Sequence, residues 1–336
     1  MKEKNHAIEF YRIIATLIIC IHHMQSKCGL AVFAHGDLCV DFFFILSGLF
    51  LAEKFIKETV HSGSEYFIRR IKRLYPEYLF AAVIGIISYS VIGKFDIKMA
   101  LPELFMVQNT GLFYGGFNYP CWYLSTLVFA SFLLYECLKY KRDLFVKIIA
   151  PIVVLSGYTY IVSQLDDPNF IWSTHMGIHV PMLRCVCGLT LGIFIRYMAQ
   201  CGFVNKISRS TGTVCEIFCI VISVTGVVTD FLSPSITVSA GALLVFITYT
   251  KRGLIGSKLL NQKIFSGIGE YSYSVYLNHG IMANTLDTVN GRFFDFGKEL
   301  LLIYLAAVIV YSVISHKLIT AVVERIKIKR LNKKVI

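Results

Sequence analysis

Apolar runs of membrane-spanning length recur along this whole chain, and they constrain its fold more than any other feature. About 20 apolar residues in a helix cross a bilayer. We expect about ten spans, at 7–26, 37–53, 77–93, 120–138, 146–163, 178–196, 213–231, 234–250, 269–287 and 299–318. The pattern predicts an all-α fold, a polytopic transmembrane helix bundle.

The composition supports a membrane protein. Of 336 residues, 56% are hydrophobic and only 16% are charged, whereas about 25% are charged in an ordinary soluble domain. The deficit extends over the full length, and no soluble domain of about 100 residues fits between the apolar runs. We therefore expect one membrane domain over 1–323, followed by a basic tail over 324–336 at the anionic inner leaflet.

The net charge is +12, and most of the basic residues lie in the loops between the apolar runs. If the N-terminus is cytoplasmic, 26 lysines and arginines lie inside and 5 outside, and Arg12 and Arg184 lie within spans. Basic residues concentrate in cytoplasmic loops of membrane proteins. The bias predicts a multi-pass protein of the cell membrane with both termini cytoplasmic, and it explains the positive charge without nucleic-acid binding.

Two ionisable residues share one face of the first span. Arg12 and His23 are eleven positions apart, roughly 20° past three helical turns and ~16 Å along the axis. Ionisable groups in a bilayer are costly and usually functional. An imidazole such as that of His23 accepts a proton from a hydroxyl or carries an acyl group. His22, ~100° around the helix, is the alternative. Asp41 in the next span either orients the imidazole or caps its own helix.

A basic segment, Phe67 to Tyr78, precedes the third span. The spacing of Arg69, Arg70 and Arg73 places them on one face of a helix. Arginine forks suit phosphates, although a basic cluster that contacts anionic lipid is also possible. The aromatic and proline residues around the cluster favour a ligand.

Three further residues are candidates for binding a substrate. Trp122 opens the fourth span, where an interfacial aromatic belt is the alternative. Arg184 and His279 are ionisable residues within spans that either line a cavity or make interhelical hydrogen bonds. Cys185 and Cys187 match no zinc spacing, and we expect no metal. The loop 94–119 is a candidate re-entrant or interfacial segment.

Five motifs in order, which together cover essentially the whole chain, resemble those of the bacterial integral-membrane acyltransferase family 3, which includes sugar and polysaccharide O-acetyltransferases. Arg12 and His23 match its arginine, ten residues, histidine signature. The other four are Gly36 to Leu49, Phe67 to Tyr78, Arg184 to Gly192 and Ser272 to His279. The chain differs at Cys39, which replaces a glycine, and at Leu127 and Val128, where many members carry an acidic residue.

The resemblance implies transfer of an acyl group, usually from cytoplasmic acetyl-CoA as donor, to a hydroxyl of an extracytoplasmic glycan or glycan precursor. We then expect His23 to act as general base or transient acyl carrier and Asp41 to orient it. Arg12 would bind the donor or a developing negative charge, and Arg69, Arg70 and Arg73 the CoA phosphates.

Two rival functions remain. A transporter or flippase for a glycan or small anionic solute would use Arg12, Arg184 and His279 to line a substrate path. A non-catalytic membrane scaffold would leave these buried ionisable residues without a reason.

Overall fold

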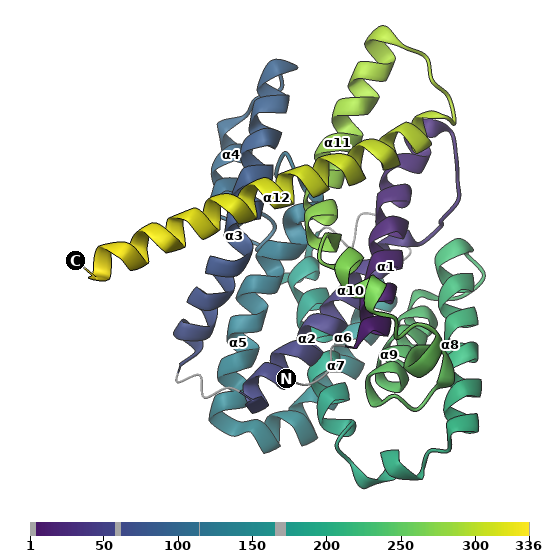
Figure 1. Ribbon diagram of the computed structural model, residues 1–336. Coiled ribbons are helices and arrows are strands. Elements are labelled where there is room, and N and C mark those ends of the chain that lie inside the picture. Colours follow the sequence, from purple (N-terminus) through teal and green to yellow (C-terminus); the bar gives the residue numbers. More distant parts are fainter. Residues whose placement is uncertain (1–4, 58–61, 114, 165–172, 336) are drawn as a thin grey trace.

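The computed structural model describes residues 5–57, 62–113, 115–164 and 173–335 (Figure 1). The fold is all-helical apart from one antiparallel pair of two-residue strands, β1 (Thr174–His175) and β2 (Ile178–His179). The α-helices are α1 (His6–Gln25), α2 (Cys39–Lys57), α3 (Gly63–Val91), α4 (Ile97–Leu104), α5 (Trp122–Leu144), α6 (Ala150–Val162), α7 (Val180–Met198), α8 (Arg209–Val228), α9 (Pro234–Thr250), α10 (Lys263–Gly269), α11 (Ser272–Phe293) and α12 (Leu300–Val335). Short 3₁₀ or π turns occur at Ser26–Cys28, Gly36–Leu38, Tyr119–Cys121, Phe145–Ile149, Gly202–Lys206 and Ile255–Leu259.

Each predicted span overlaps one of these helices, so the all-α prediction is confirmed. Within the described ranges, 6 helices are long and apolar enough to cross a membrane. They are His6–Cys28, Gly63–Val91, Tyr119–Val162, Val180–Met198, Arg209–Val228 and Leu300–Lys329. The number of ten spans and the cytoplasmic location of the termini stay predictions; Lys2 and Lys4, which count toward that orientation, lie outside the described residues.

Two helices are longer than their apolar runs. Helix α3 begins at Gly63, where the Ser62 hydroxyl accepts a hydrogen bond from the Glu65 amide at 3.1 Å. The basic segment is therefore the first half of α3, which continues through Pro76. Helix α12 runs without a break past residue 323, and in Figure 1 it crosses in front of α3 and projects beyond the bundle.

The centre of the bundle is a close contact between α2 and α7. A Cβ atom on Gly48 would lie 1.9 Å from the Leu189 carbonyl oxygen, and one on Gly192 would lie 1.9 Å from that of Ile45. Small residues at such interfaces let two helix backbones approach closely. Arg196 of α7 also pairs with Glu53 near the end of α2. Helices α1, α5 and α9 pack on α2, and helices α5, α6 and α9 pack on α7.

The segment between α3 and α5 folds back onto the bundle. The Glu103 carboxylate is fully buried and accepts hydrogen bonds from the Phe117 amide (2.6 Å) and the Asn118 amide (3.2 Å). Burial raises the pKa of Glu103 to about 7. The Asn118 side chain donates to the Leu277 carbonyl at 2.7 Å, and so ties this segment to α11. As a result Tyr119 lies beside α1 and α11.

Candidate active site

A polar cavity of about 350 Å³ lies among α1, α2, α3, α5, α10 and α11. We call it the arginine cavity. Its charged lining residues are Glu9, Arg12, Arg70, Arg73, Glu77 and Glu270. Arg12 and two of the three α3 arginines that we expected to bind phosphates thus line the same cavity. Arg69 does not line it; its guanidinium pairs with Glu65 one turn earlier on α3.

The arginines of this cavity retain unused hydrogen-bond donors. Arg70 donates to the Tyr66 hydroxyl at 2.6 Å, but its buried Nε has no partner in the described ranges. Arg73 has no hydrogen bond or ion pair within the same ranges. Guanidinium groups with free N–H donors bind oxyanions well, because charge-assisted hydrogen bonds are strong. This side of the cavity therefore suits a phosphate group.

Two of the three glutamates of the cavity are engaged. Glu9 accepts a hydrogen bond from Arg12 Nη1 at 2.7 Å. Glu77 accepts one from the Ser274 hydroxyl and lies 3.0 Å from His316 Nδ1 of α12. Glu77 is a site residue that the sequence reasoning missed; its place directly after Pro76 in the basic helix was the available signal. Neither glutamate neutralises Arg70 or Arg73 by direct pairing.

The far end of α1 carries a second cluster, which we call the histidine pair. The His23 ring stacks on the His279 ring, with centroids 5.3 Å apart and planes at 29°. The Tyr119 ring completes the cluster in a T-shaped contact, with its centroid 5.0 Å from that of His23. His279 is fully buried. Two histidines 256 positions apart are thus brought into direct contact.

His22 has different surroundings. Its Nδ1 lies 3.2 Å from the Phe33 carbonyl oxygen, and its side chain packs on Gly36, where an added Cβ would lie 2.5 Å from His22 Cβ. The loop before α2 therefore holds His22 in place, while His23 faces α11. Of the two candidates, His23 is the one whose ring stacks on His279.

One tyrosine connects the arginine cavity to the histidine pair. Tyr276 lines the cavity, and its ring lies 5.3 Å from that of His279. Its hydroxyl donates to the Pro120 carbonyl at 2.7 Å, which fixes the ring. Arg12 lines the arginine cavity from the first half of α1, and His23 lies in the last turn of the same helix, where it stacks on His279 of α11.

Comparison with known proteins identifies the family at this point. A family model described as an acyltransferase domain, that of acyltransferase family 3, matches residues 5–316. The chain belongs to this family. The comparisons with curated proteins and with solved structures gave no match. The matched range contains every residue of the arginine cavity and of the histidine pair, so the site lies in the acyltransferase domain.

Asp41 of this acyltransferase does not bond to His23, which corrects our expectation that it orients the imidazole. Its two carboxylate oxygens accept hydrogen bonds from Arg184 Nε at 3.0 and 2.9 Å. Arg184 Nη2 also lies 3.2 Å from Asp37 Oδ2. Asp41 and Arg184 are buried, on α2 and α7 respectively, while His23 faces α11. Breaking such a buried pair is costly, so both residues have a structural role here.

Trp122 is also buried, and its ring packs edge-to-face with that of Phe44 of α2, with the centroids 5.9 Å apart. Because Trp122 packs in the protein core, it does not fit the alternative of a residue in an interfacial aromatic belt. A substrate contact by Trp122, Arg184 or His279 stays a prediction.

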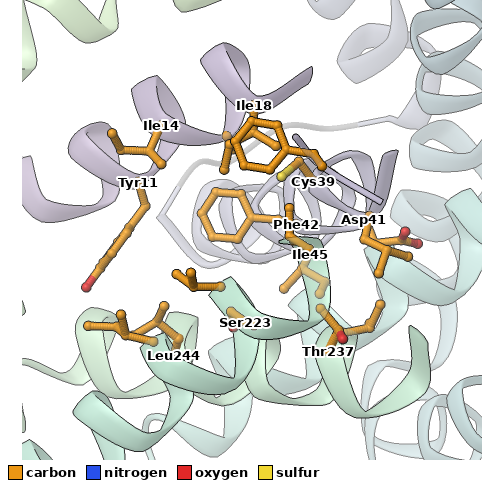
Figure 2. Close-up of a pocket in the computed structure, with 18 of the residues that line it drawn as sticks. Tyr11, Ile14, Ile18, Cys39, Asp41, Phe42, Ile45, Ser223, Thr237 and Leu244 are labelled. Carbon is orange, nitrogen blue, oxygen red and sulfur yellow. The ribbon is translucent and has the colours of Figure 1, made fainter. Parts of the chain in front are cut away.

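A second cavity of the acyltransferase is apolar. It measures about 340 Å³ and lies between α1 and α2 on one side and α8 and α9 on the other. Figure 2 shows Tyr11, Ile14 and Ile18 of α1 facing Leu244 of α9 across it. Of its lining residues among those described, only Asp41 is charged, and Arg184 engages that carboxylate. The cavity therefore suits an apolar group and not acid–base chemistry.

The described residues include no cluster of three or more histidine, cysteine, aspartate or glutamate side chains that suits a metal ion. The arginine cavity and the histidine pair together form the candidate active site.

Proposed function

We propose that this acyltransferase moves an acyl group, with acetyl as the first candidate, from cytoplasmic acyl-CoA to a hydroxyl of a surface glycan or glycan precursor. The observation that carries the proposal is that one residue, Tyr276, both lines the arginine cavity and contacts the histidine pair. This contact supports a donor site next to an acid–base site.

The arginine cavity would hold the CoA moiety. Arg70 and Arg73 have donors available for its phosphates, and Arg12 lies on the α1 wall. Charge-assisted bonds to phosphate oxygens give affinity and orientation. The charge bias of the loops supports a cytoplasmic location for this cavity, because the arginines of α3 lie on the side predicted to be inside.

The histidine pair would receive the acceptor. His23 takes the proton of the acceptor hydroxyl while the hydroxyl oxygen attacks the thioester carbonyl carbon. The carbon–sulfur bond then breaks, and the departing thiolate takes the proton from His23. In the alternative route, a His23 nitrogen attacks the thioester carbonyl carbon, and the carbon–sulfur bond breaks to release the thiolate. The acceptor hydroxyl then attacks the acyl group on His23, the carbon–nitrogen bond breaks, and the hydroxyl proton passes to the thiolate. Both routes leave His23 unchanged.

The test has two parts. Mass spectrometry of surface glycans from cells with and without the protein identifies the acceptor and the added group. The purified full-length protein, given labelled acetyl-CoA and that glycan fraction, then shows whether label is transferred. We expect transfer by the wild type and by His22→Ala, and none by His23→Ala.

Activity retained by His23→Ala would remove that residue from the mechanism. Movement of the glycan across vesicle membranes without consumption of acetyl-CoA would instead support the transporter or flippase.

A further inference from the structure

The tautomer of His279 follows from its surroundings. Its Nδ1 lies 2.6 Å from the Tyr276 carbonyl oxygen, and a carbonyl oxygen only accepts hydrogen bonds. Nδ1 must therefore carry the hydrogen. A neutral imidazole has a single N–H, so Nε2 is left as a bare acceptor.

This acceptor is unused. His279 is 0% exposed, and within the described ranges its Nε2 has no hydrogen-bond partner. Burying a polar atom without a partner costs free energy. The ring is held in place nonetheless, because its Nδ1 donates a hydrogen bond to the Tyr276 carbonyl. The Tyr304 hydroxyl donates to the backbone carbonyl of His279 at 3.2 Å and so holds the main chain.

The ring of His23 stacks on that of His279, and an imidazole N–H is a donor that suits this acceptor. The other described ring neighbours of His23 are His22 and Tyr119. In acid–base catalysis a third group commonly orients the base. Asp41, which we expected in that role, is taken up by Arg184.

We propose that His279 is the positioning residue for His23. When His23 takes the proton of the acceptor hydroxyl, both of its nitrogens carry hydrogen. The His23 ring then rotates so that one of its N–H groups donates a hydrogen bond to the bare Nε2 of His279. The proton passes on from the other nitrogen to the departing thiolate, and His279 ends as it began. This inference rests on the proposed function, because it assigns a partner to the same base.

Three substitutions separate the two nitrogens of His279. His279→Asn keeps an N–H donor near the Tyr276 carbonyl but has no group at the Nε2 position. His279→Gln reaches that position with a carbonyl oxygen. His279→Phe keeps the stacked ring without either nitrogen. The assay is acetyl transfer from labelled acetyl-CoA to the glycan fraction by the full-length protein, with kcat and KM measured separately and folding checked by thermal unfolding in detergent.

We expect His279→Asn and His279→Phe to lower kcat about 100-fold, the lower end of general acid–base effects. The KM for acetyl-CoA should stay within about twofold, because the arginine cavity is untouched. His279→Gln should restore part of kcat.

Wild-type kcat in His279→Asn would overturn the inference and leave the proposed function standing. A loss in all three variants that follows a lower unfolding temperature would also overturn it, in favour of a packing role. A wild type that does not consume acetyl-CoA would overturn the proposed function, and the inference with it.

Discussion

The ring of Tyr276 lies 5.3 Å from that of His279, and the same ring forms part of the wall of the arginine cavity. One aromatic side chain therefore lies between the arginine cavity and the histidine pair. Tyr123, whose ring lies 5.4 Å from Tyr276, completes this boundary. On the proposed function, the acyl group passes these two rings or is presented at them.

The boundary gives a first prediction. Tyr276→Phe removes the hydrogen bond to the Pro120 carbonyl and should lower the free energy of unfolding by about 1 kcal/mol. Transfer activity should stay within a few-fold of wild type, because the hydroxyl is occupied by that bond and the ring remains. Unfolding in detergent and labelled-acetyl transfer measure the two effects. A loss of activity greater than 100-fold in a folded Tyr276→Phe protein would instead assign chemistry to the hydroxyl.

The arginines of α3 give a second prediction. Arg73→Gln should weaken acetyl-CoA binding by about tenfold to a hundredfold, since a hydrogen bond to a charged group contributes roughly 1.5–3 kcal/mol. Arg69→Gln is the matched control, because Arg69 pairs with Glu65 away from the cavity. Calorimetric titration of the purified protein compares them. Equal losses in both variants would point to a general charge effect at the surface.

The buried ion pair gives a third prediction. Asp41→Asn leaves Arg184 without its main counter-charge and should destabilise the protein by about 3–5 kcal/mol. Replacing both residues, as in Asp41→Leu with Arg184→Leu, should cost less than the two single changes together, because the uncompensated charge disappears. Chemical unfolding in detergent measures each variant. A stable Asp41→Asn protein without activity would return Asp41 to the catalytic site.

The contact between α2 and α7 gives a fourth prediction. Gly48→Ala and Gly192→Ala place a Cβ against a backbone carbonyl at 1.9 Å, so the helices must separate and stability must fall. Gly241→Ala in α9 is the control, since its Cβ would meet nothing within 4 Å and alanine favours a helix by about 1 kcal/mol over glycine. The unfolding temperature should therefore fall for Gly48→Ala and Gly192→Ala, and it should stay equal or rise for Gly241→Ala.

Glu103 gives a fifth prediction, on pH. Its folded-state pKa of about 7 lies above the ordinary value of 4.5 because the carboxyl is buried. The folded protein thus binds the proton more tightly than the unfolded chain. The resulting stabilisation is complete below pH 4.5 and is lost as the pH rises through 7, about 3 kcal/mol in all.

Glu103→Gln should flatten this dependence. One amide oxygen can serve the Phe117 and Asn118 amides together, because both already lie within 3.3 Å of the same carboxylate oxygen. Unfolding curves from pH 4 to 8 provide the measurement. An unchanged slope in Glu103→Gln would mean that another group sets it.

The helices were predictable from the sequence because each apolar run of sufficient length forms one. The site was predictable in part. The spacing of Arg12 and His23 follows from helical geometry alone, and so does the grouping of Arg70 with Arg73. Which face of α3 turns inward does not, and for this reason Arg69 was included although it faces Glu65.

Contacts between helices that are far apart in the chain could not be predicted from the sequence. Arg184 bonds Asp41 across 143 positions, and no local pattern indicates that this arginine and not His23 takes the carboxylate. The stack of His23 on His279 depends likewise on the packing of α1 against α11.

Helices α2 and α7 are joined at three levels: by the Asp41–Arg184 pair, by the contacts at Gly48 and Gly192, and by the Glu53–Arg196 pair. These contacts oppose sliding and rotation between the two helices. On the proposed function, the acyl group passes Tyr276, which belongs to α11 and not to this joined pair. We therefore expect a displacement of α11 relative to α2 and α7 to open or close the route.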